Sequence, residues 1–249
     1  MWDSFVFALQ FLTRIQIANP EWDYNKCGRG GAFFPVIGLV VGGCLLIVSK
    51  IGLALFPAVI VAAFLILAGV IITGGLHMDG FMDSMDGLFS GRDRERQLEI
   101  MKDSRVGSFG VLGLGCLLLI KFVFYLELLN MNAFLWMLAV PVFGRWTMVY
   151  AIRFFPYLRQ QGLGNPYSDC IGNREFTWAT LVLGVTLICT LRAGAVVFLI
   201  PIFLIHLGLR GINTTLGGLS GDIYGAAEEI AEVMGLITVY LVYTKYLLI

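Results

Sequence analysis

Long apolar runs constrain this chain more than any other feature of its sequence. A helix needs about 20 predominantly apolar residues to cross a bilayer. Hydrophobic residues make up 58% of the 249 residues, and charged residues only 14%, about half the charged share of an ordinary soluble domain. A core for a chain of this size needs less apolar surface, so the excess must face lipid. The sequence predicts an all-α, polytopic transmembrane helical bundle.

We expect about seven spans, which the apolar runs place at residues 31–49, 52–73, 108–129, 133–150, 176–191, 194–209 and 230–248. The runs 176–191 and 194–209 are separated only by Arg192 and Ala193, which predicts a tight hairpin. Residues 1–19 are amphipathic, so this segment is expected on the membrane surface or partly inserted. No long polar stretch remains for a second domain, so residues 1–249 are expected to form a single integral membrane domain.

Charge and cysteine content exclude several classes of protein. The formal net charge is zero, so the chain lacks the basic footprint of a nucleic-acid-binding protein. The five cysteines are scattered, with no CxxC pair, which indicates neither a disulfide framework nor a zinc site.

Lysine and arginine are distributed unevenly between the two sides that alternating spans would create. One side holds Arg14, Lys26, Arg29, Arg92, Arg94, Arg96, Lys102, Arg105, Arg153, Arg159, Arg174 and Arg210. The other side holds Lys50, Arg192 and Lys245. Because basic loops remain in the cytoplasm, we expect the N-terminus and the three longer loops there.

An acidic segment follows the second span. It reads HMDGFMDSMDGLFSGRDRERQLEIMKD from His77 to Asp103 and contains seven of the 17 acidic residues. Asp79, Asp83 and Asp86 are spaced i, i+4 and i+7, so on a helix they form one stripe. Three neighbouring carboxylates repel one another unless a cation lies between them, and oxygen ligands of this kind suit Mg²⁺. A solvated helix face is the simpler alternative, but acids directly beside a membrane span are costly and usually functional.

Basic residues follow these acids. Lys102 and Arg105 lie just before the third span and are candidates for binding phosphate oxygens, with Asp103 as a further metal ligand or base. Taken alone, the two cations have a simpler alternative explanation as anchors on the basic side of the membrane. Metal-binding acids beside phosphate-binding bases are the combination that phosphoryl transfer requires.

Other polar residues stand out in apolar surroundings. Arg145 lies inside a span, where a buried arginine requires a phosphate or carboxylate partner. Ser220 and Asp222 lie in the glycine-rich loop GGLSGDIYG, which suits either close approach to a phosphate or a turn with a helix N-cap. Glu228 and Glu229 are expected at a helix start, where the helix dipole explains them.

Several blocks together resemble one family. The stretches TGGLHMDGFMDSMDG (73–87) and LEIMKDSRVGSFG (98–110) resemble the signatures of the cobalamin synthase, or adenosylcobinamide-GDP ribazoletransferase, family. FLTRIQI (11–17), FFPVIGLVVG (33–42), Arg145, GLG (162–164) and GGLSGDIYGAAEE (217–229) resemble other blocks of that family in the same order.

The resemblance implies a reaction in the last stage of vitamin B12 assembly. Adenosylcobinamide-GDP and α-ribazole, or its 5′-phosphate, would give adenosylcobalamin, or its 5′-phosphate, and GMP, with Mg²⁺ as cofactor. The enzyme would lie in the bacterial inner membrane, in contact with lipid, with its active site, about residues 73–107, facing the cytoplasm. Association with a second copy of the chain or with other cobalamin-assembly enzymes is left open.

The residue roles implied by this chemistry are specific. Asp79, Asp83, Asp86 and Asp103 are candidate Mg²⁺ ligands and catalytic residues. His77 is a candidate base, a partner of the ligands or a structural histidine. The candidate substrate-binding residues are Lys102, Arg105, Arg145, Ser220 and Asp222.

Two other classes of membrane protein compete with this reading. CDP-alcohol phosphotransferases also place an aspartate array at the cytoplasmic end of a helix, but their motif continues with Ala-Arg, whereas here Phe81 and Met82 lead directly to Asp83. A cation or metabolite transporter predicts charged residues deep in several spans and helices broken at the midplane. Here the acids gather at one edge of the membrane.

Overall fold

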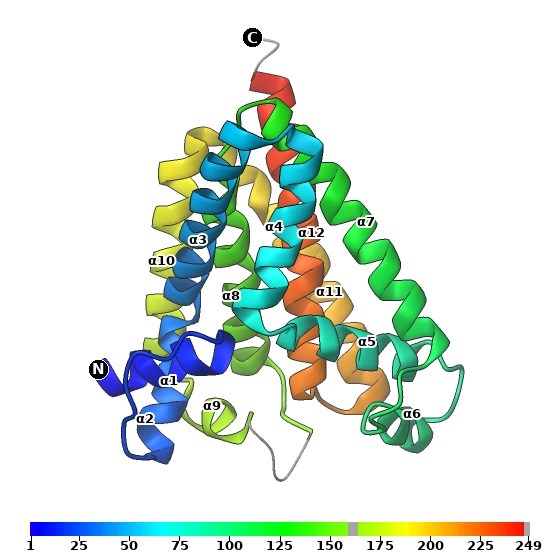
Figure 1. Ribbon diagram of the computed structural model, residues 1–249. Helices are drawn as coiled ribbons and strands as arrows, with labels where there is room; N and C mark the ends of the chain where they lie inside the picture. Colours follow the sequence, from blue (N-terminus) through cyan, green and yellow to red (C-terminus); the bar gives the residue numbers. More distant parts are fainter. Residues whose placement is uncertain (159–163, 247–249) are drawn as a thin grey trace.

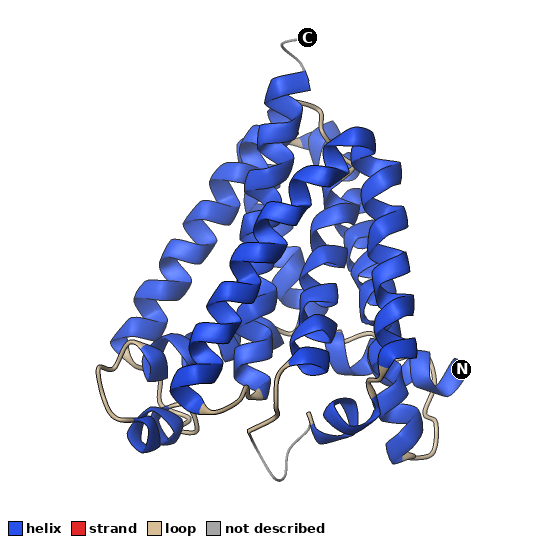
Figure 2. Cartoon of the chain, turned by 180° about the vertical axis from the view of Figure 1, so that it is seen from behind, coloured by secondary structure: helices blue, strands red, loops and turns tan. Residues whose placement is uncertain are grey.

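The computed structural model describes residues 1–158 and 164–246. Within these ranges the regular structure is helical, apart from an isolated β-bridge between Tyr157 and Leu219 (Figure 2). The helices are α1 (Trp2–Leu12), α2 (Tyr24–Arg29), η1 (Gly30–Phe33), α3 (Phe34–Leu55), α4 (Ala58–Thr73), α5 (Leu76–Leu88), α6 (Arg94–Ile100), α7 (Ser108–Asn130), α8 (Trp136–Phe154), α9 (Asn165–Cys170), α10 (Asn173–Leu191), η2 (Arg192–Phe198), α11 (Leu199–Leu216) and α12 (Gly221–Tyr246). The predicted all-α membrane bundle is confirmed.

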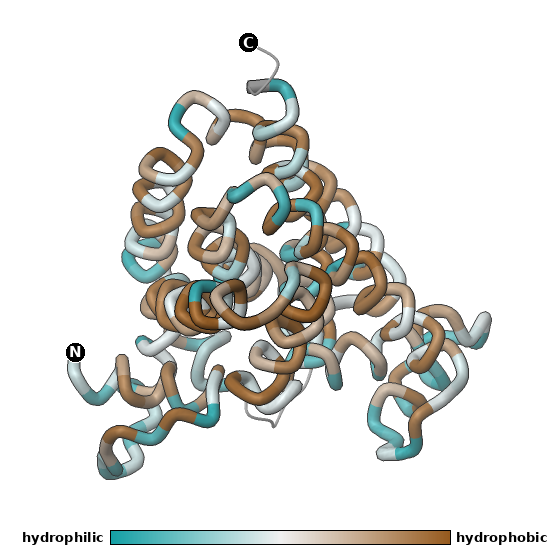
Figure 3. Tube along the Cα trace, turned by 45° about the horizontal axis from the view of Figure 1, so that its top comes forward, coloured by the Kyte–Doolittle hydropathy of each residue, from teal (hydrophilic) through white to brown (hydrophobic). Residues whose placement is uncertain are grey.

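The long helices run between two ends of the molecule. Figure 1 shows α1, α2, α5, α6 and α9 gathered at one end with the N-terminus, while the α3–α4 connection and the C-terminus lie at the other. Hydrophobic residues predominate along the long helices (Figure 3). The end that carries the N-terminus is the side predicted to be rich in lysine and arginine. The other end is the side predicted to hold few basic residues. Two residues named from the sequence lie outside the described residues. They are Arg159 of the basic set and Gly162 of the GLG block.

The number of spans stays a prediction. By length and apolarity, three helical stretches within the described residues are able to cross a membrane: 24–55, Ser108–Asn130 and 173–216. A fourth is added if α4 and α5, which are bent by 93°, form one broken span. Helices such as α8 and α12 carry buried charged residues, so apolarity alone does not identify them as membrane spans. Helices enclosed by other helices do not have to be apolar on every face.

Two predicted connections were wrong. The first span does not end before Lys50, because α3 continues through it to Leu55, and the chain turns at Phe56 and Pro57. Proline has no N–H for a continuing helix, which explains the turn there. The predicted tight hairpin is instead the seven-residue η2. It separates α10, which packs on α8, from α11, which packs on α12.

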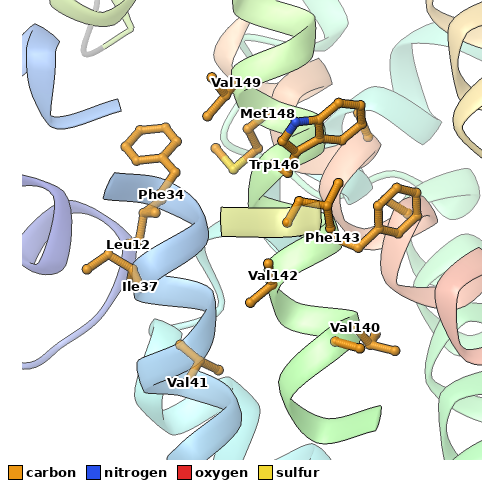
Figure 4. Close-up of a cluster of buried hydrophobic side chains, with 14 of the residues drawn as sticks. Leu12, Phe34, Ile37, Val41, Val140, Val142, Phe143, Trp146, Met148 and Val149 are labelled. Carbon is orange, nitrogen blue, oxygen red and sulfur yellow. The ribbon is translucent and has the colours of Figure 1, made fainter. Parts of the chain in front are cut away.

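Helix α8 lies at the centre of the bundle, where it packs against α3, α10 and α12. Figure 4 shows Ile37 and Val41 of α3 beside Val142 of α8 in the apolar core. A side chain at Gly38 of α3 would meet the α8 backbone at Pro141 and Val142. Small residues of this kind let membrane helices approach closely, so α3 and α8 form a tight central pair.

Candidate active site

A sharp bend places the acidic segment at the end of the bundle. Gly74 and Gly75 follow α4 with φ angles of +68° and +72°, values that favour glycine because it lacks a Cβ. The bend between α4 and α5 is 93°, so α5 lies across the end of the long helices rather than continuing α4 (Figure 1). The acidic residues are thereby kept out of the bundle interior.

Two further glycines bring α5 against the start of α12. A Cβ at Gly80 would lie 2.9 Å from the Cα and carbonyl oxygen of Asp222, and a Cβ at Gly225 would lie 3.2 Å from the Cα of His77. The backbones therefore approach more closely than larger residues would permit. This contact joins two segments that are about 140 residues apart in the sequence.

A cavity of about 170 Å³ lies at this contact. His77 and Asp79 of α5 and Asp222 of α12 contribute its polar groups. Aromatic residues form much of the remaining wall: Phe11, Phe34, Tyr157, Tyr167 and Tyr224. A cavity with few polar groups and an aromatic wall is typical of a small-molecule site. The structure thus brings together three of the residues that the sequence singled out.

The loop before α12 is held in place by the segment after α8. The N–H of Leu158 donates to the carbonyl of Leu219, and the N–H of Leu219 donates to the carbonyl of Pro156, at 2.9 and 2.8 Å. Buried Ser220 accepts a 3.4 Å hydrogen bond from the N–H of Ile223, and its hydroxyl donates to Asp222 at 3.3 Å. Ser220 therefore caps α12 and orients Asp222, as the N-cap reading of this loop expected.

Asp86, the third acid of the stripe, has a different environment. Its carboxylate is buried and accepts backbone N–H hydrogen bonds from Gly107 at 2.7 Å and Gly110 at 2.9 Å. Both donors belong to the first turn of α7 and its N-cap, where N–H groups lack partners within the helix. Asp86 thus caps a neighbouring helix and fixes the 101–107 loop against α5.

The residues of that loop do not line the cavity. Arg105 is largely exposed and forms an ion pair with Asp103 at 2.6 Å. Hydrogen bonds from the Arg105 side chain and backbone lower the pKa of Asp103 to about 2. Lys102 is also exposed. The structure therefore places Lys102, Asp103 and Arg105 beside the Asp86 end of α5 rather than beside Asp79.

Arg145 is buried inside the bundle, where its partners are carboxylates. A carboxylate was one of the two kinds of partner expected from the sequence, which did not identify the residues. Arg145 lies 2.5 Å from Glu228 and also pairs with Glu232. The expectation that Glu228 and Glu229 sit at a helix start was wrong, because α12 begins at Gly221 and they lie two turns inside it.

The same cluster contains a second buried cation. Lys121 of α7 pairs with Glu229 and, at 2.8 Å, with Glu232. Acids at 228 and 232 are one turn apart and face one side of a helix. Together with Lys121 and Arg145 in neighbouring spans, that spacing was the signal available in the sequence.

Two sets of carboxylates lie close enough together to be considered as a metal site. Within the described residues, the three acids whose oxygens lie within 4.8 Å of one another are Glu228, Glu229 and Glu232. Lys121 and Arg145 already neutralise two of those charges, so this set does not fit a divalent cation. Asp79 and Asp222, by contrast, both line the cavity, and carboxylate oxygens are donors of the kind that fit Mg²⁺.

Known proteins resemble this chain over nearly its whole length. A model of the family described as Cobalamin-5-phosphate synthase matches residues 4–240. A relative from Desulfitobacterium hafniense (strain Y51), named adenosylcobinamide-GDP ribazoletransferase, is 38% identical over 239 residues, covering 92% of this chain and 93% of that protein. A protein of the same name from Roseiflexus sp. (strain RS-1) is 39% identical over 242 residues, covering 94% and 88%. No solved structure shows significant similarity to the chain.

Proposed function

The chain belongs to the Cobalamin-5-phosphate synthase family and is a transferase, and from this premise we propose that it is an adenosylcobinamide-GDP ribazoletransferase. The observation that carries the proposal is the cavity where α5 meets α12, which combines Asp79, Asp222 and His77 with an aromatic wall. Family membership favours this activity over a CDP-alcohol phosphotransferase or a transporter.

The proposed reaction replaces GMP, which is joined to the cobinamide phosphate through an anhydride, by a ribose hydroxyl. A ribose hydroxyl of α-ribazole, or of its 5′-phosphate, forms a bond to the phosphorus attached to cobinamide. The anhydride P–O bond to GMP breaks, GMP leaves with that electron pair, and the hydroxyl proton is lost. The products are adenosylcobalamin, or its 5′-phosphate, and GMP.

Asp79, Asp83 and Asp222 are proposed to hold Mg²⁺ at this site. Asp79 and Asp222 line the cavity, and Asp83 follows Asp79 by one turn of α5. Mg²⁺ would neutralise charge on the phosphate oxygens. Asp86 and Asp103 are proposed to support the site instead, since backbone N–H groups bind Asp86 and Arg105 binds Asp103.

The chain's own residues would bind and orient the substrates. The aromatic wall suits stacking against the flat ring systems of the nucleotide and ribazole. Lys102 and Arg105 are proposed to attract the anionic substrates from the neighbouring loop. Arg145 is not proposed as a substrate contact, because Glu228 and Glu232 already bind it inside the bundle.

The proposed setting is a single integral membrane domain in the bacterial inner membrane, with the cavity on the cytoplasmic side. The end of the molecule that carries α5 is the end with most lysines and arginines. Basic residues favour the cytoplasmic side, which would also give the site access to nucleotide substrates.

A direct assay tests the proposed function. Detergent-purified protein is incubated with adenosylcobinamide-GDP, α-ribazole 5′-phosphate and Mg²⁺, and GMP is measured by chromatography. We expect GMP release that requires both substrates. Absence of GMP release from folded protein supplied with both substrates and metal would contradict the proposal.

A further inference from the structure

A second and larger hollow adjoins the contact between α5 and α12. Its volume is about 530 Å³, which is within the range of small-molecule sites. We call it the α11 groove, because one face of α11 lines it together with α5, α12 and Gln97 of α6. Phe81 and Ile223 line the groove, and the residues directly before them, Gly80 and Asp222, line the cavity of the candidate active site. The groove and the cavity therefore share two helices.

The lining of the α11 groove is mainly apolar, and it opens on the outside of the bundle. Leu204, Leu207 and Ile230 belong to the lining and are between 44% and 46% exposed. At the end of α11, the Arg94 Nε of α6 donates a 2.7 Å hydrogen bond to the carbonyl of Leu216. This bond holds α6 beside the groove. A ligand of the groove must therefore be apolar over most of its surface.

Two buried polar atoms interrupt this apolar lining. Ser84 Oγ and Gln97 Oε1 are buried and have no hydrogen-bond partner in the described part of the chain. The two residues are only 2% and 8% exposed, and both line the groove. Because a buried polar atom without a partner costs free energy, the pair points to a ligand that supplies the missing hydrogen bonds.

The position of Ser84 on α5 directs its side chain toward the groove. The α5 residues that line the groove are Phe81, Ser84, Met85 and Leu88. Their i, i+3, i+4 and i+7 spacing defines one helix face, with Ser84 near its middle. A helical hydroxyl can donate to the carbonyl four residues earlier, as Thr186 does at 2.7 Å. Within the described residues Ser84 makes no such bond, so its hydroxyl is available to a ligand.

Gln97 contributes an acceptor from the opposite wall. Its Nε2 donates a 2.9 Å hydrogen bond to the carbonyl of Arg92, which fixes the amide and leaves Oε1 as an acceptor. An acyl chain of a membrane lipid has no N–H or O–H group to offer this oxygen. The groove therefore suits a ligand that carries hydrogen-bond donors on an apolar body.

We propose that the α11 groove binds the corrin ring of adenosylcobinamide-GDP, with amide groups at the edge of the ring bonded to Gln97 Oε1 and Ser84 Oγ. The inference rests on the proposed function, because it assigns one part of the proposed substrate to the groove. A corrin ring is flat, has apolar faces and carries primary amides around its edge, so it matches both the lining and the two polar atoms.

The location of the groove agrees with the proposed reaction. Asp83, one of the acids proposed to hold Mg²⁺, directly precedes Ser84. A ring bound in the groove therefore lies next to the acidic face of α5, where the phosphate-bearing arm of the same substrate would react. The aromatic cavity on the other side of the α5–α12 contact then remains for the nucleotide and ribazole rings.

A glycine in the groove allows a matched pair of variants. Gly208 of α11 lines the groove, and a Cβ there would meet nothing within 4 Å. Gly208→Phe therefore fills the groove without displacing a helix. Gly184→Phe makes the same change in α10, at a glycine that also has nothing within 4 Å of a Cβ. Both variants should fold, because phenylalanine favours a helix more than glycine does.

Cobinamide is the probe for binding, since it contains the corrin ring and its amides but no nucleotide. Equilibrium dialysis against protein in lipid nanodiscs, read by the visible absorbance of cobinamide, gives the Kd. We expect Gly208→Phe to raise the Kd by about tenfold or more, as a misfit in an apolar site does, and Gly184→Phe to leave it unchanged. Equal affinity in the two variants, or no binding of cobinamide to the wild type, would overturn the inference.

Ser84→Ala tests the hydroxyl separately from the shape of the groove. Because Ser84 Oγ has no partner in the free protein, its removal should leave the unfolding temperature unchanged. The affinity for cobinamide should fall by about two- to tenfold, which corresponds to the loss of one hydrogen bond. A lower unfolding temperature with unchanged affinity would instead show that the hydroxyl serves the fold, and would contradict its assigned role.

Kinetics separate this inference from the proposed function. In the GMP-release assay, Gly208→Phe should raise KM for adenosylcobinamide-GDP by about tenfold or more and leave KM for α-ribazole 5′-phosphate close to that of the wild type. A rise in KM for α-ribazole 5′-phosphate alone would contradict the assignment of the groove. Failure of the wild type to release GMP would refute the proposed function, while the binding of cobinamide still decides what the groove holds.

Discussion

Asp79 and Asp86 lie on one face of α5, yet the structure gives them different partners. Asp79 is exposed to the cavity, whereas the buried carboxylate of Asp86 accepts two N–H groups at the start of α7. The i, i+7 spacing identifies both acids but does not distinguish a ligand from a cap. That distinction depends on α7, which is brought to α5 only by the fold.

The two acids should therefore respond differently to the same substitution. Asp86→Asn replaces one accepting oxygen by an NH₂ group facing an N–H donor, and we expect a loss of about 1.5–3 kcal/mol in the free energy of unfolding. Asp79→Asn should leave unfolding unchanged but lower kcat by about 100-fold or more, because transition-state charge is no longer neutralised. Thermal unfolding in detergent and GMP release measure the two effects. A reversed pattern, with stability lost in Asp79→Asn alone, would contradict these roles.

At the scale of helices, the site depends on how closely α5 and α12 approach. Gly80 faces the backbone of Asp222, and Gly225 faces that of His77. The sequence analysis noted the glycines of the loop before α12. It did not show that Gly80 and Gly225 bring α5 and α12 together, because contact between segments about 140 residues apart is a property of the tertiary fold.

Gly80→Ala should impair turnover by separating the helices. The new Cβ would lie 2.9 Å from the Asp222 backbone, so α5 or α12 must shift, and a displacement of this kind can cost about 100-fold in rate. Gly115→Ala on α7 is the control, since its Cβ would meet nothing within 4 Å and alanine favours the helix. Comparable activity of the two variants in the GMP-release assay would show that the close approach is unimportant.

At the scale of the whole molecule, composition predicted the all-α membrane bundle. It did not predict which charged residues inside the bundle contact one another. Apolar runs mark helices that face lipid, such as α7. Helix α12 carries Glu228, Glu229 and Glu232 on faces that meet Lys121 and Arg145. In the sequence, each of these charged residues interrupts an apolar run without an evident partner. Only the three-dimensional structure shows that they form ion pairs with one another.

The proposed orientation predicts which end of the bundle is reachable from outside the cell. In a background lacking the five native cysteines, exposed Asn130→Cys should react with a membrane-impermeant maleimide in intact cells. Exposed Ser104→Cys, in the loop next to α5, should react only after the membrane is opened. The two positions lie at opposite ends of α7. Labelling of Ser104→Cys in intact cells would place the cavity on the outer side of the membrane and contradict the proposed orientation.

The most direct measurement for the account is the Mg²⁺ dependence of GMP release in the wild type and in Asp222→Asn. Asp222 is the acid that the fold, rather than the α5 spacing, brings to Asp79. If both acids hold one metal site, the Mg²⁺ concentration for half-maximal rate should rise by about tenfold or more in the variant. Identical Mg²⁺ curves, or wild-type turnover that persists after chelation of all divalent cations, would contradict a shared metal site at the α5–α12 contact.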